Sequence, residues 1–171
     1  MNAQANNSHQ EKFILSVLVA NHFGVLTRIS GLFSRRGYNI DSLNVGETET
    51  PELSRMTIIV TGDDYIKSQI VKQLAKLQEV KKVELLPKSE TVLREHLLIK
   101  ICTTRQTRSE VIEAVNVFRG KVVDFNTDSL VVEINGEQSK LNAFIEFTKA
   151  YGIIEICRSG ALAMKRGAEA L

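Results

Sequence analysis

Hydrophobic positions along the first half of the chain follow two spacings, which predict short strands and helices. Apolar residues crowd together or alternate over residues 13–19, 38–45, 56–60 and 80–85, as in strands. They recur with helical spacing over Val25–Arg36, before Gly37 as a candidate C-cap, and again after a candidate N-cap at Asp63 or Asp64. The order βαββαβ over residues 12–86 predicts a ferredoxin-like sandwich.

The same order repeats after a predicted linker at Pro87–Thr91. Strands are expected at 97–102, 121–125, 130–134 and 153–157. A helix follows a capping box of Thr107 and Glu110, with Gly120 as its C-cap, and a second helix covers 141–148. We therefore predict an α+β chain of two ferredoxin-like sandwiches in tandem, at 12–86 and 92–160. Residues 1–11 and 161–171 are expected to be tails, and the Gly- and Ala-rich stretch 158–171 either flexible or a partner-contacting arm.

Composition narrows the classes of protein that this chain fits. Of its 171 residues 43% are hydrophobic and 25% are charged, and the net charge of +2 is typical of a soluble protein. No basic block or stripe of interleaved aromatics predicts a nucleic-acid partner, and no apolar run predicts a membrane span. The polar N-terminal stretch lacks a signal core, so a cytoplasmic location is expected. Cys102 and Cys157 are far apart, and each ends an apolar run, which predicts buried reduced thiols.

Residues with catalytic chemistry do not form a convincing set. His96 beside Glu95 is expected to be structural or solvated, and Asp63-Asp64 is better explained as a helix cap than as a carboxylate pair. His22 is open to two interpretations, a ligand contact or a surface residue. With no nucleophile and base, no metal cage and no cofactor loop, we expect no catalytic residue, no metal site and no cofactor in this chain. These absences favour a binding module over an enzyme or a sensor that acts on nucleic acid.

The stretch Val19–Arg28 joins the first strand to the first helix and carries the strongest candidate site. Gly24 stands where the helix is expected to begin. Free N–H groups at a helix start attract a carboxylate, and glycine lets a ligand approach the backbone closely. The turn is therefore either a binding site for a small amino acid or only a tight turn.

Several motifs resemble one family, the small regulatory subunit of acetolactate synthase (acetohydroxyacid synthase). The resemblance extends from about Phe13 to Gly160. It is carried by the segments Leu15–Val19, Asn21–Leu26, Gly31–Ile40, Leu53–Thr57, Phe118-Arg119-Gly120 and Arg158-Ser159-Gly160. Phe33–Ile40 together with Ser54–Thr57 is the specific part.

The resemblance implies a division of labour between the two halves. The first half is expected to be an ACT domain, an amino-acid-binding module that forms homodimers with effector sites at the interface. The second half is expected to bind and activate the large catalytic subunit. In this family that partner carries thiamine diphosphate, Mg²⁺ and FAD, and condenses pyruvate with pyruvate or 2-ketobutyrate. The small subunit activates it and confers feedback inhibition, usually by valine, in the synthesis of valine, leucine and isoleucine.

The effector residues that the resemblance implies come from the turn and from the second strand: Asn21, Gly24, Val25, Leu26, Asn39 and Ile40. For valine, the amides of Gly24–Leu26 suit the carboxylate, the oxygens of Asn21 and Asn39 suit the ammonium, and Leu26 and Ile40 suit the isopropyl group. Asn39 is equally open to being a turn residue, whereas Leu26 and Ile40 are better explained as plain core than as direct contacts. The family often has acidic or small polar residues at the positions of His22 and Phe23, so the preference among valine, leucine and isoleucine stays open.

Overall fold

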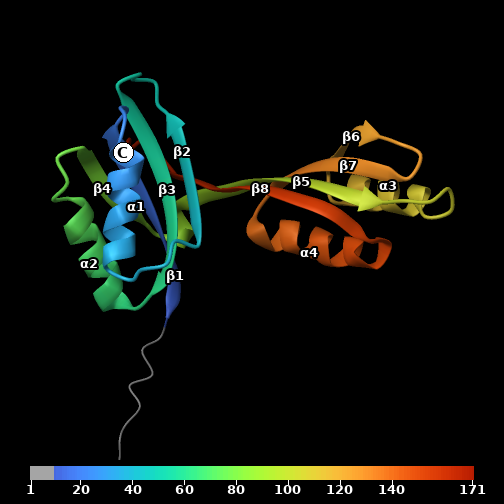
Figure 1. Ribbon diagram of the computed structural model, residues 1–171, viewed down its shortest axis with the longest axis horizontal. Coiled ribbons are helices and arrows are strands. Elements are labelled where there is room, and N and C mark those ends of the chain that lie inside the picture. The colour runs from blue at the N-terminus through green and yellow to red at the C-terminus, as the bar shows by residue number, and fades with distance from the viewer. Residues whose placement is uncertain (1–9) are drawn as a thin grey trace, which may run out of the picture. The chain divides into compact units, whose positions relative to one another are not determined.

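The computed structural model describes residues 10–171, which fold into two compact units (Figure 1). One unit contains the chain up to Val92 together with Ala163–Leu171, and the other contains Leu93–Leu162. Each has a four-stranded antiparallel sheet with helices, so the predicted fold class is confirmed. Residues 1–9 of the expected N-terminal tail lie outside the described part, and Glu11 already begins the first strand.

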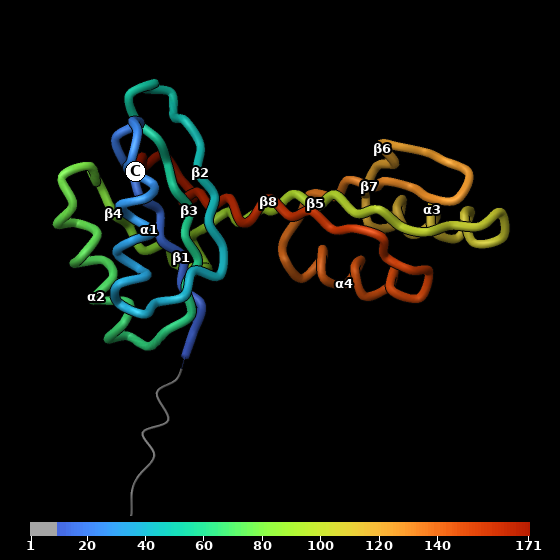
Figure 2. Tube along the Cα trace, viewed as in Figure 1, coloured from blue at the N-terminus to red at the C-terminus, as the bar shows by residue number. Residues whose placement is uncertain are grey.

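The first unit has the predicted βαββαβ order, which can be followed along the tube in Figure 2. Its sheet has the strand order β2-β3-β1-β4. The elements are β1 Glu11–Ala20, α1 Val25–Arg35, β2 Ser42–Glu47, β3 Leu53–Gly62, α2 Asp64–Leu74 and β4 Val80–Leu86, followed by a 3-10 turn at Lys88–Glu90. The predicted cap of α2 is Asp63, whose Oδ1 accepts a hydrogen bond from the Ile66 amide at 2.8 Å.

Both faces of this sheet are covered. Alternate residues of β1, such as Leu15 and Val17, pack with α1 and α2 in the main core. Ile14 and Ser16 point to the opposite face and are buried as well, at 3% and 1% exposure. Residues 163–171 account for this, because the Ala163 amide donates to Thr57 Oγ1 at 3.4 Å and Lys82 Nζ donates to the Ala170 carbonyl at 3.1 Å. The end of the chain thus differs from the tail that we expected at 161–171.

The second unit repeats the order, and its sheet has the strand order β6-β7-β5-β8. The elements are β5 Thr91–Cys102, α3 Arg108–Val117, β6 Lys121–Phe125, β7 Ser129–Gly136, α4 Gln138–Thr148, a 3-10 turn at Lys149–Tyr151, and β8 Ile153–Lys165. Buried aliphatic side chains of β5 and β7 pack against α3 and α4, and Phe118 meets Phe144 edge to face with 5.2 Å between ring centroids.

A bidentate ion pair joins β5 to β8 in this unit. Arg158 Nε and Nη2 donate to the two carboxylate oxygens of Glu95 at 2.7 and 2.6 Å, and Arg158 Nη1 donates to Asn142 Oδ1 of α4 at 3.0 Å. Glu95 is 7% exposed. Its hydrogen bond raises the pKa of Arg158 above the ordinary arginine value, against the opposing effect of partial burial. The arginine of the Arg158-Ser159-Gly160 motif therefore has a structural role.

Two predicted helix caps in the second unit are wrong, although α3 does begin directly after Thr107. The Thr107 side chain does not cap α3; instead Thr104 and Thr107 exchange hydrogen bonds, each hydroxyl accepting from the other's amide at 3.0 and 3.2 Å. At the end of α3 the left-handed residue is Arg119, with φ 52°, and not Gly120. Gly120 is required by space, because a Cβ there would lie 2.8 Å from Ile134 Cγ1 and 3.0 Å from the Glu133 carbonyl oxygen.

Two further predictions from the sequence need correction. Cys102 and Cys157 are free thiols, but both are exposed and not buried as predicted; Cys102 is the last residue of β5, and Cys157 lies within β8 at the edge of its sheet. Strand β2 begins at Ser42 and not at Tyr38. The Tyr38 amide still donates to the Phe33 carbonyl at 3.0 Å, so the chain is leaving α1 at that point.

Candidate functional site

The turn between β1 and α1 presents an uncapped helix start to solvent. Gly24 has φ 87° and ψ −12°, a left-handed conformation that glycine adopts without steric cost, and a Cβ built there would meet nothing within 4 Å. Within residues 10–171 no side chain caps α1, and no acidic residue lies in its first turn. The Val25 amide has only a long contact to the His22 carbonyl, at 3.5 Å. Such a helix start favours an anion.

Around this turn, the side chains of the predicted residues have different surroundings. Val25 is 4% exposed and belongs to the core, so only its backbone is available to a ligand. Leu26 is 46% exposed, so the alternative that it is plain core is wrong. Phe23 is fully exposed beside it, and the exposed His22 has its Nδ1 3.1 Å from the Phe23 carbonyl oxygen.

Asn21 is held by the loop between β2 and β3. Its backbone amide donates to the Glu52 carbonyl at 2.7 Å, and its Nδ2 donates to the Pro51 carbonyl at 2.8 Å and to Glu47 Oε1 at 3.4 Å. These bonds use the amide hydrogens and leave Oδ1 as an acceptor. They also bring the Glu47 carboxylate to the turn, a second acceptor for an ammonium. Sequence reasoning missed Glu47, because only the pairing of β2 with β3 places it there.

Asn39 and Ile40 lie just before β2. Asn39 is exposed, and its Nδ2 donates to Asp41 Oδ1 at 3.1 Å, while Asp41 Oδ2 accepts from Thr61 Oγ1 at 2.5 Å. Ile40 is half-buried and packs against the core of the first unit. Asn39 therefore holds the approach to β2 in place and keeps its Oδ1 free to accept a hydrogen bond.

Within one chain the two groups of predicted residues lie at opposite ends of the sheet. Ala20, next to the turn, pairs with Leu53 at the start of β3, whereas the Asp41 amide donates to the Ile59 carbonyl near its end. Six residues of extended chain separate these points, which is about 20 Å. A valine-sized ligand cannot bridge that distance, so one chain by itself does not bring Gly24 and Asn39 together.

The corresponding turn of the second unit is closed by its own side chains. Thr104 and Thr107 engage each other there, and Arg108 donates to the Thr127 carbonyl while its guanidinium carbon lies 4.9 Å from the centre of the Phe125 ring. No glycine opens this turn. The second unit therefore lacks the uncapped, accessible helix start of the first.

Other chemistry is missing from the described residues, 10–171. No group of three or more His, Cys, Asp or Glu side chains is arranged to hold a metal ion. No helix in this part of the chain has the length and apolar character to cross a membrane.

Comparison with known proteins assigns the family. A model described as "AHAS small subunit-like ACT domain" matches residues 15–82, and one described as "Small subunit of acetolactate synthase" matches residues 94–167. A probable acetolactate synthase small subunit from Archaeoglobus fulgidus is 47% identical over 156 residues, which cover 91% of this chain and 98% of that protein. The chain belongs to the acetolactate synthase small-subunit family. The acetolactate synthase small subunit from Mycolicibacterium smegmatis is 50% identical over 153 residues and 90% of each chain.

A solved structure supports the same assignment at the level of the fold. The crystal structure of the acetolactate synthase small subunit from Thermotoga maritima superposes with a TM-score of 0.87 at 41% identity. The match covers 93% of this small subunit and 99% of the other chain. The resemblance read from the motifs is thereby confirmed, as is the ACT domain in the first half.

Proposed function

We propose that this small subunit activates a thiamine-diphosphate-dependent acetolactate synthase large subunit and confers valine feedback inhibition on it, in branched-chain amino-acid biosynthesis. The observation that carries the proposal is the uncapped start of α1 at Gly24, in a chain of this family. The large subunit supplies the active site and holds thiamine diphosphate, Mg²⁺ and FAD. This chain supplies the effector site and acts from the cytoplasm.

A bound valine finds a partner for each of its three groups near the turn. The carboxylate binds the amides of Gly24–Leu26 with help from the helix dipole. The ammonium donates to the oxygens of Asn21 and Glu47, which already lie together. The isopropyl group packs against the exposed Leu26. Within one chain the expected contacts from Asn39 and Ile40 are missing.

A homodimer through β2 supplies the missing contacts from the second chain. Strand β2 is an edge of its sheet, and an exposed edge favours pairing with another chain. Asn39 and Ile40 precede the start of β2, while Glu47 at its end contacts the turn residue Asn21. Two-fold antiparallel pairing of β2 strands aligns the start of one with the end of the other, so the partner's Asn39 comes to the Gly24 turn. Each dimer then has two complete sites.

The second unit binds and activates the large subunit. Its own turn is closed, and it exposes large apolar side chains, among them Val123, Phe125, Ile154 and Ile156. Such side chains are typical of surfaces that contact another protein. Valine then acts by linkage, since it shifts the enzyme only through its different affinity for two states, typically ~1–3 kcal/mol.

Reconstitution tests the function directly. A purified large subunit with its cofactors is assayed for acetolactate production alone, with the small subunit, and with the small subunit across a valine titration. We expect the small subunit to raise the rate and valine to lower it only when the small subunit is present. No change of rate on addition of the small subunit would contradict activation, and valine-independent activity of the pair would contradict the feedback role.

A further inference from the structure

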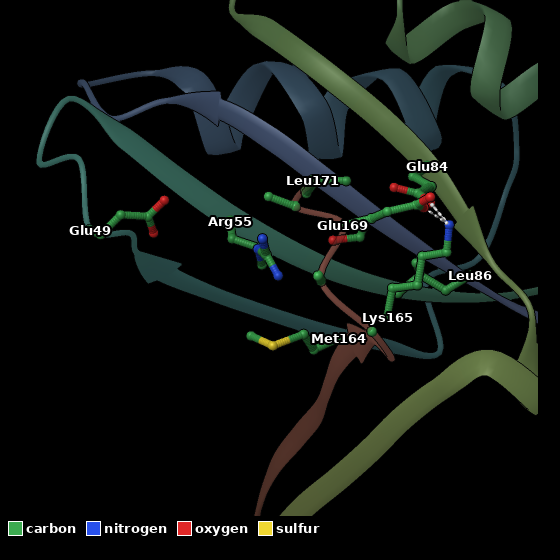
Figure 3. A pocket seen from close by; sticks show the side chains of 12 residues that line it. Glu49, Arg55, Glu84, Leu86, Met164, Lys165, Glu169 and Leu171 are labelled. Carbon is green, nitrogen blue, oxygen red and sulfur yellow. Dashed lines mark hydrogen bonds and ion pairs between the residues drawn. The ribbon is translucent and has the colours of Figure 1, made fainter.

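A cavity of about 260 Å³ lies between the sheet of the first unit and the C-terminal segment, residues 163–171 (Figure 3). Ser16 of β1 and Leu86 of β4 come from the sheet, Arg55 from β3, and Met164 and Leu171 from the C-terminal segment. Because Leu15 and Val17 face α1 and α2, Ser16 points to the other face of the sheet. The cavity is therefore separate from the turn at the start of α1.

The Ser16 hydroxyl lines this cavity without a hydrogen-bond partner in the described part of the chain. Ser16 as a whole is 1% exposed. The polar neighbours on the same face are engaged, since Thr57 Oγ1 accepts from the Ala163 amide and Glu84 pairs with Lys165 at 3.6 Å. A buried polar group left unsatisfied carries the cost of its lost hydration without compensation. A ligand that reaches Ser16 recovers that cost.

Two charged side chains that line the cavity are also unengaged. Among residues 10–171, neither the Arg55 guanidinium nor the Glu49 carboxylate has a hydrogen bond or ion pair, and both border the cavity in Figure 3. The other charges are paired: Lys165 Nζ lies 3.6 Å from Glu84 and 2.5 Å from Glu169. The hydrogen bond between Lys165 and Glu169 raises the pKa of Lys165 and lowers the pKa of Glu169, as expected of a pair that stays ionised.

We propose that this cavity is a second binding site, for a small aliphatic α-amino acid. Arg55 binds the carboxylate through its planar guanidinium, Glu49 accepts from the ammonium, and the Ser16 hydroxyl donates to the bound carboxylate. The aliphatic side chain packs on Leu86, Met164 and Leu171.

Charge favours a zwitterion over a simple ion. A lone anion would meet three carboxylates (Glu49, Glu84 and Glu169) against two cations, Arg55 and Lys165. A lone cation would face the unpaired Arg55. The volume also suffices, because a cavity of about 150 Å³ already holds benzene. Since the C-terminal segment forms one wall, bound amino acid also stabilises that segment against the sheet. This site goes beyond the proposed function, which uses the α1 turn and the dimer through β2 but not this cavity.

Backbone amide chemical shifts of the isotope-labelled full chain test the proposal. L-Valine and L-leucine are titrated, together with isovalerate, which lacks the ammonium, and isobutylamine, which lacks the carboxylate. We expect the amino acids to shift the amides of Ser16, Arg55 and residues 164–171, and either half-ligand to bind at least about tenfold more weakly, a difference of ~1.4 kcal/mol. The same shifts should persist in Gly24→Asp, which separates this cavity from the turn.

Three variants assign the contacts. Arg55→Met should weaken binding at the cavity by about tenfold or more, and Ser16→Ala by about fivefold, the worth of one hydrogen bond of ~1 kcal/mol. Ser16→Ala should also keep the fold, because it removes a hydroxyl that has no partner within the described residues. Arg166→Met is the matched control. Arg166 is an exposed arginine of the C-terminal segment that does not line the cavity, so its loss should leave the affinity at the cavity unchanged.

Each contrary result overturns the proposal. These results are an absence of shifts at the cavity amides, isovalerate binding as tightly as valine, or an unchanged affinity in Arg55→Met. If Arg55→Met does not fold, the Ser16→Ala variant provides the test. An affinity for the amino acid that is unchanged in Ser16→Ala would then overturn the site. Shifts confined to the amides of Gly24–Leu26 would exclude the cavity and leave the proposed function standing. Shifts at the cavity amides without any at the turn would support the cavity and contradict the effector site at the turn.

Discussion

At the scale of single residues, two glycines are needed for different reasons, Gly24 before the start of α1 and Gly120 after the end of α3. Gly24 needs its left-handed φ of 87° and stands in open space, so its role is to shape and expose the helix start. Gly120 follows the left-handed Arg119 and is needed because Ile134 and the Glu133 backbone leave no room for a Cβ. In the Arg-Gly pairs that follow α1 and α3, the left-handed residue is Gly37 in the first pair, with φ 69°, and Arg119 in the second, so the two pairs do not share one backbone feature. Of these glycines, only Gly24 belongs to a candidate ligand site.

Gly24→Asp should remove valine inhibition and keep activation. Its carboxylate would face the ligand's carboxylate, and two like charges ~4 Å apart near a protein surface repel by ~4 kcal/mol, about two to three decades of affinity. A side chain at this φ adds strain of about 1 kcal/mol, although Asp and Asn tolerate it best. The measurement is acetolactate production by the reconstituted enzyme across a valine titration.

Gly24→Asn is the matched control, because it has nearly the same size and the same strain but no charge. It should shift the inhibition curve by less than about tenfold. Equal loss in both variants would point to backbone strain and not to charge. An inhibition curve unchanged in Gly24→Asp would remove this turn from the effector site, and loss of activation together with inhibition would make the turn structural.

At the scale of elements, contacts between residues far apart in the sequence join strands to one another and to helices. The C-terminal segment covers a face of the first sheet, so a chain that ends near Lys88 would expose Ile14, Ser16 and Ile59. Such a truncation is therefore a poor test of which half activates the enzyme. In the second unit, Arg158 of β8 binds Glu95 of β5 and Asn142 of α4, so one side chain joins three elements.

Arg158→Met should lower the free energy of unfolding of the second unit by about 2 kcal/mol. Removing one partner of a buried ion pair costs ~3–5 kcal/mol, and the 29% exposure of the Arg158 side chain reduces that. Arg94→Met is the control, because Arg94 and Glu137 form an exposed pair at 3.4 Å that should contribute only ~0–1 kcal/mol. Denaturant unfolding, with hydrogen exchange of the β5 and β8 amides, measures both. Similar losses in the two variants would contradict a special role for Arg158.

At the scale of the whole molecule, the proposed effector site is incomplete in one chain. The Gly24 turn and Asn39 lie about 20 Å apart along β3, so both act on one ligand only if a second chain contributes. Pairing of β2 edges meets that need and also covers an exposed strand. The proposed effector site therefore requires the dimer, and a test of one is a test of the other.

Mixing two inactive variants tests this arrangement. Gly24→Asp and Asn39→Ala should each lose valine inhibition as homodimers. When the two are refolded together, roughly half of the dimers should be mixed, and each mixed dimer should regain one intact site, since the unmutated turn meets the unmutated Asn39 of the partner. Acetolactate production across a valine titration should then show partial recovery of inhibition.

The double variant mixed with the unmutated chain is the control. With Gly24→Asp and Asn39→Ala in one chain, the mixed dimer should have no intact site. If both residues served a site within one chain, the outcomes would reverse: the two single variants would not rescue each other, and the double variant's mixed dimer would keep one site.

The sequence by itself determined the elements and the family. Hydrophobic spacing reports which face of each helix or strand is buried, and this sufficed for the βαββαβ order in both halves and for the Asp63 cap, whose partner is three residues away. Gly24 was identified from local chemistry, because a helix start and its glycine are adjacent in the chain.

Only the tertiary structure decided what depends on contacts between distant segments. Register placed Glu47 beside Asn21 and separated Asn39 from Gly24, and local spacing contains no information on either. The partners of Arg158, the exposure of both cysteines, and the cover that residues 163–171 form over Ser16 likewise arise from residues far apart in the chain. Periodicity shows that a face is apolar or polar, whereas what lies against that face is set by the packing of the folded chain.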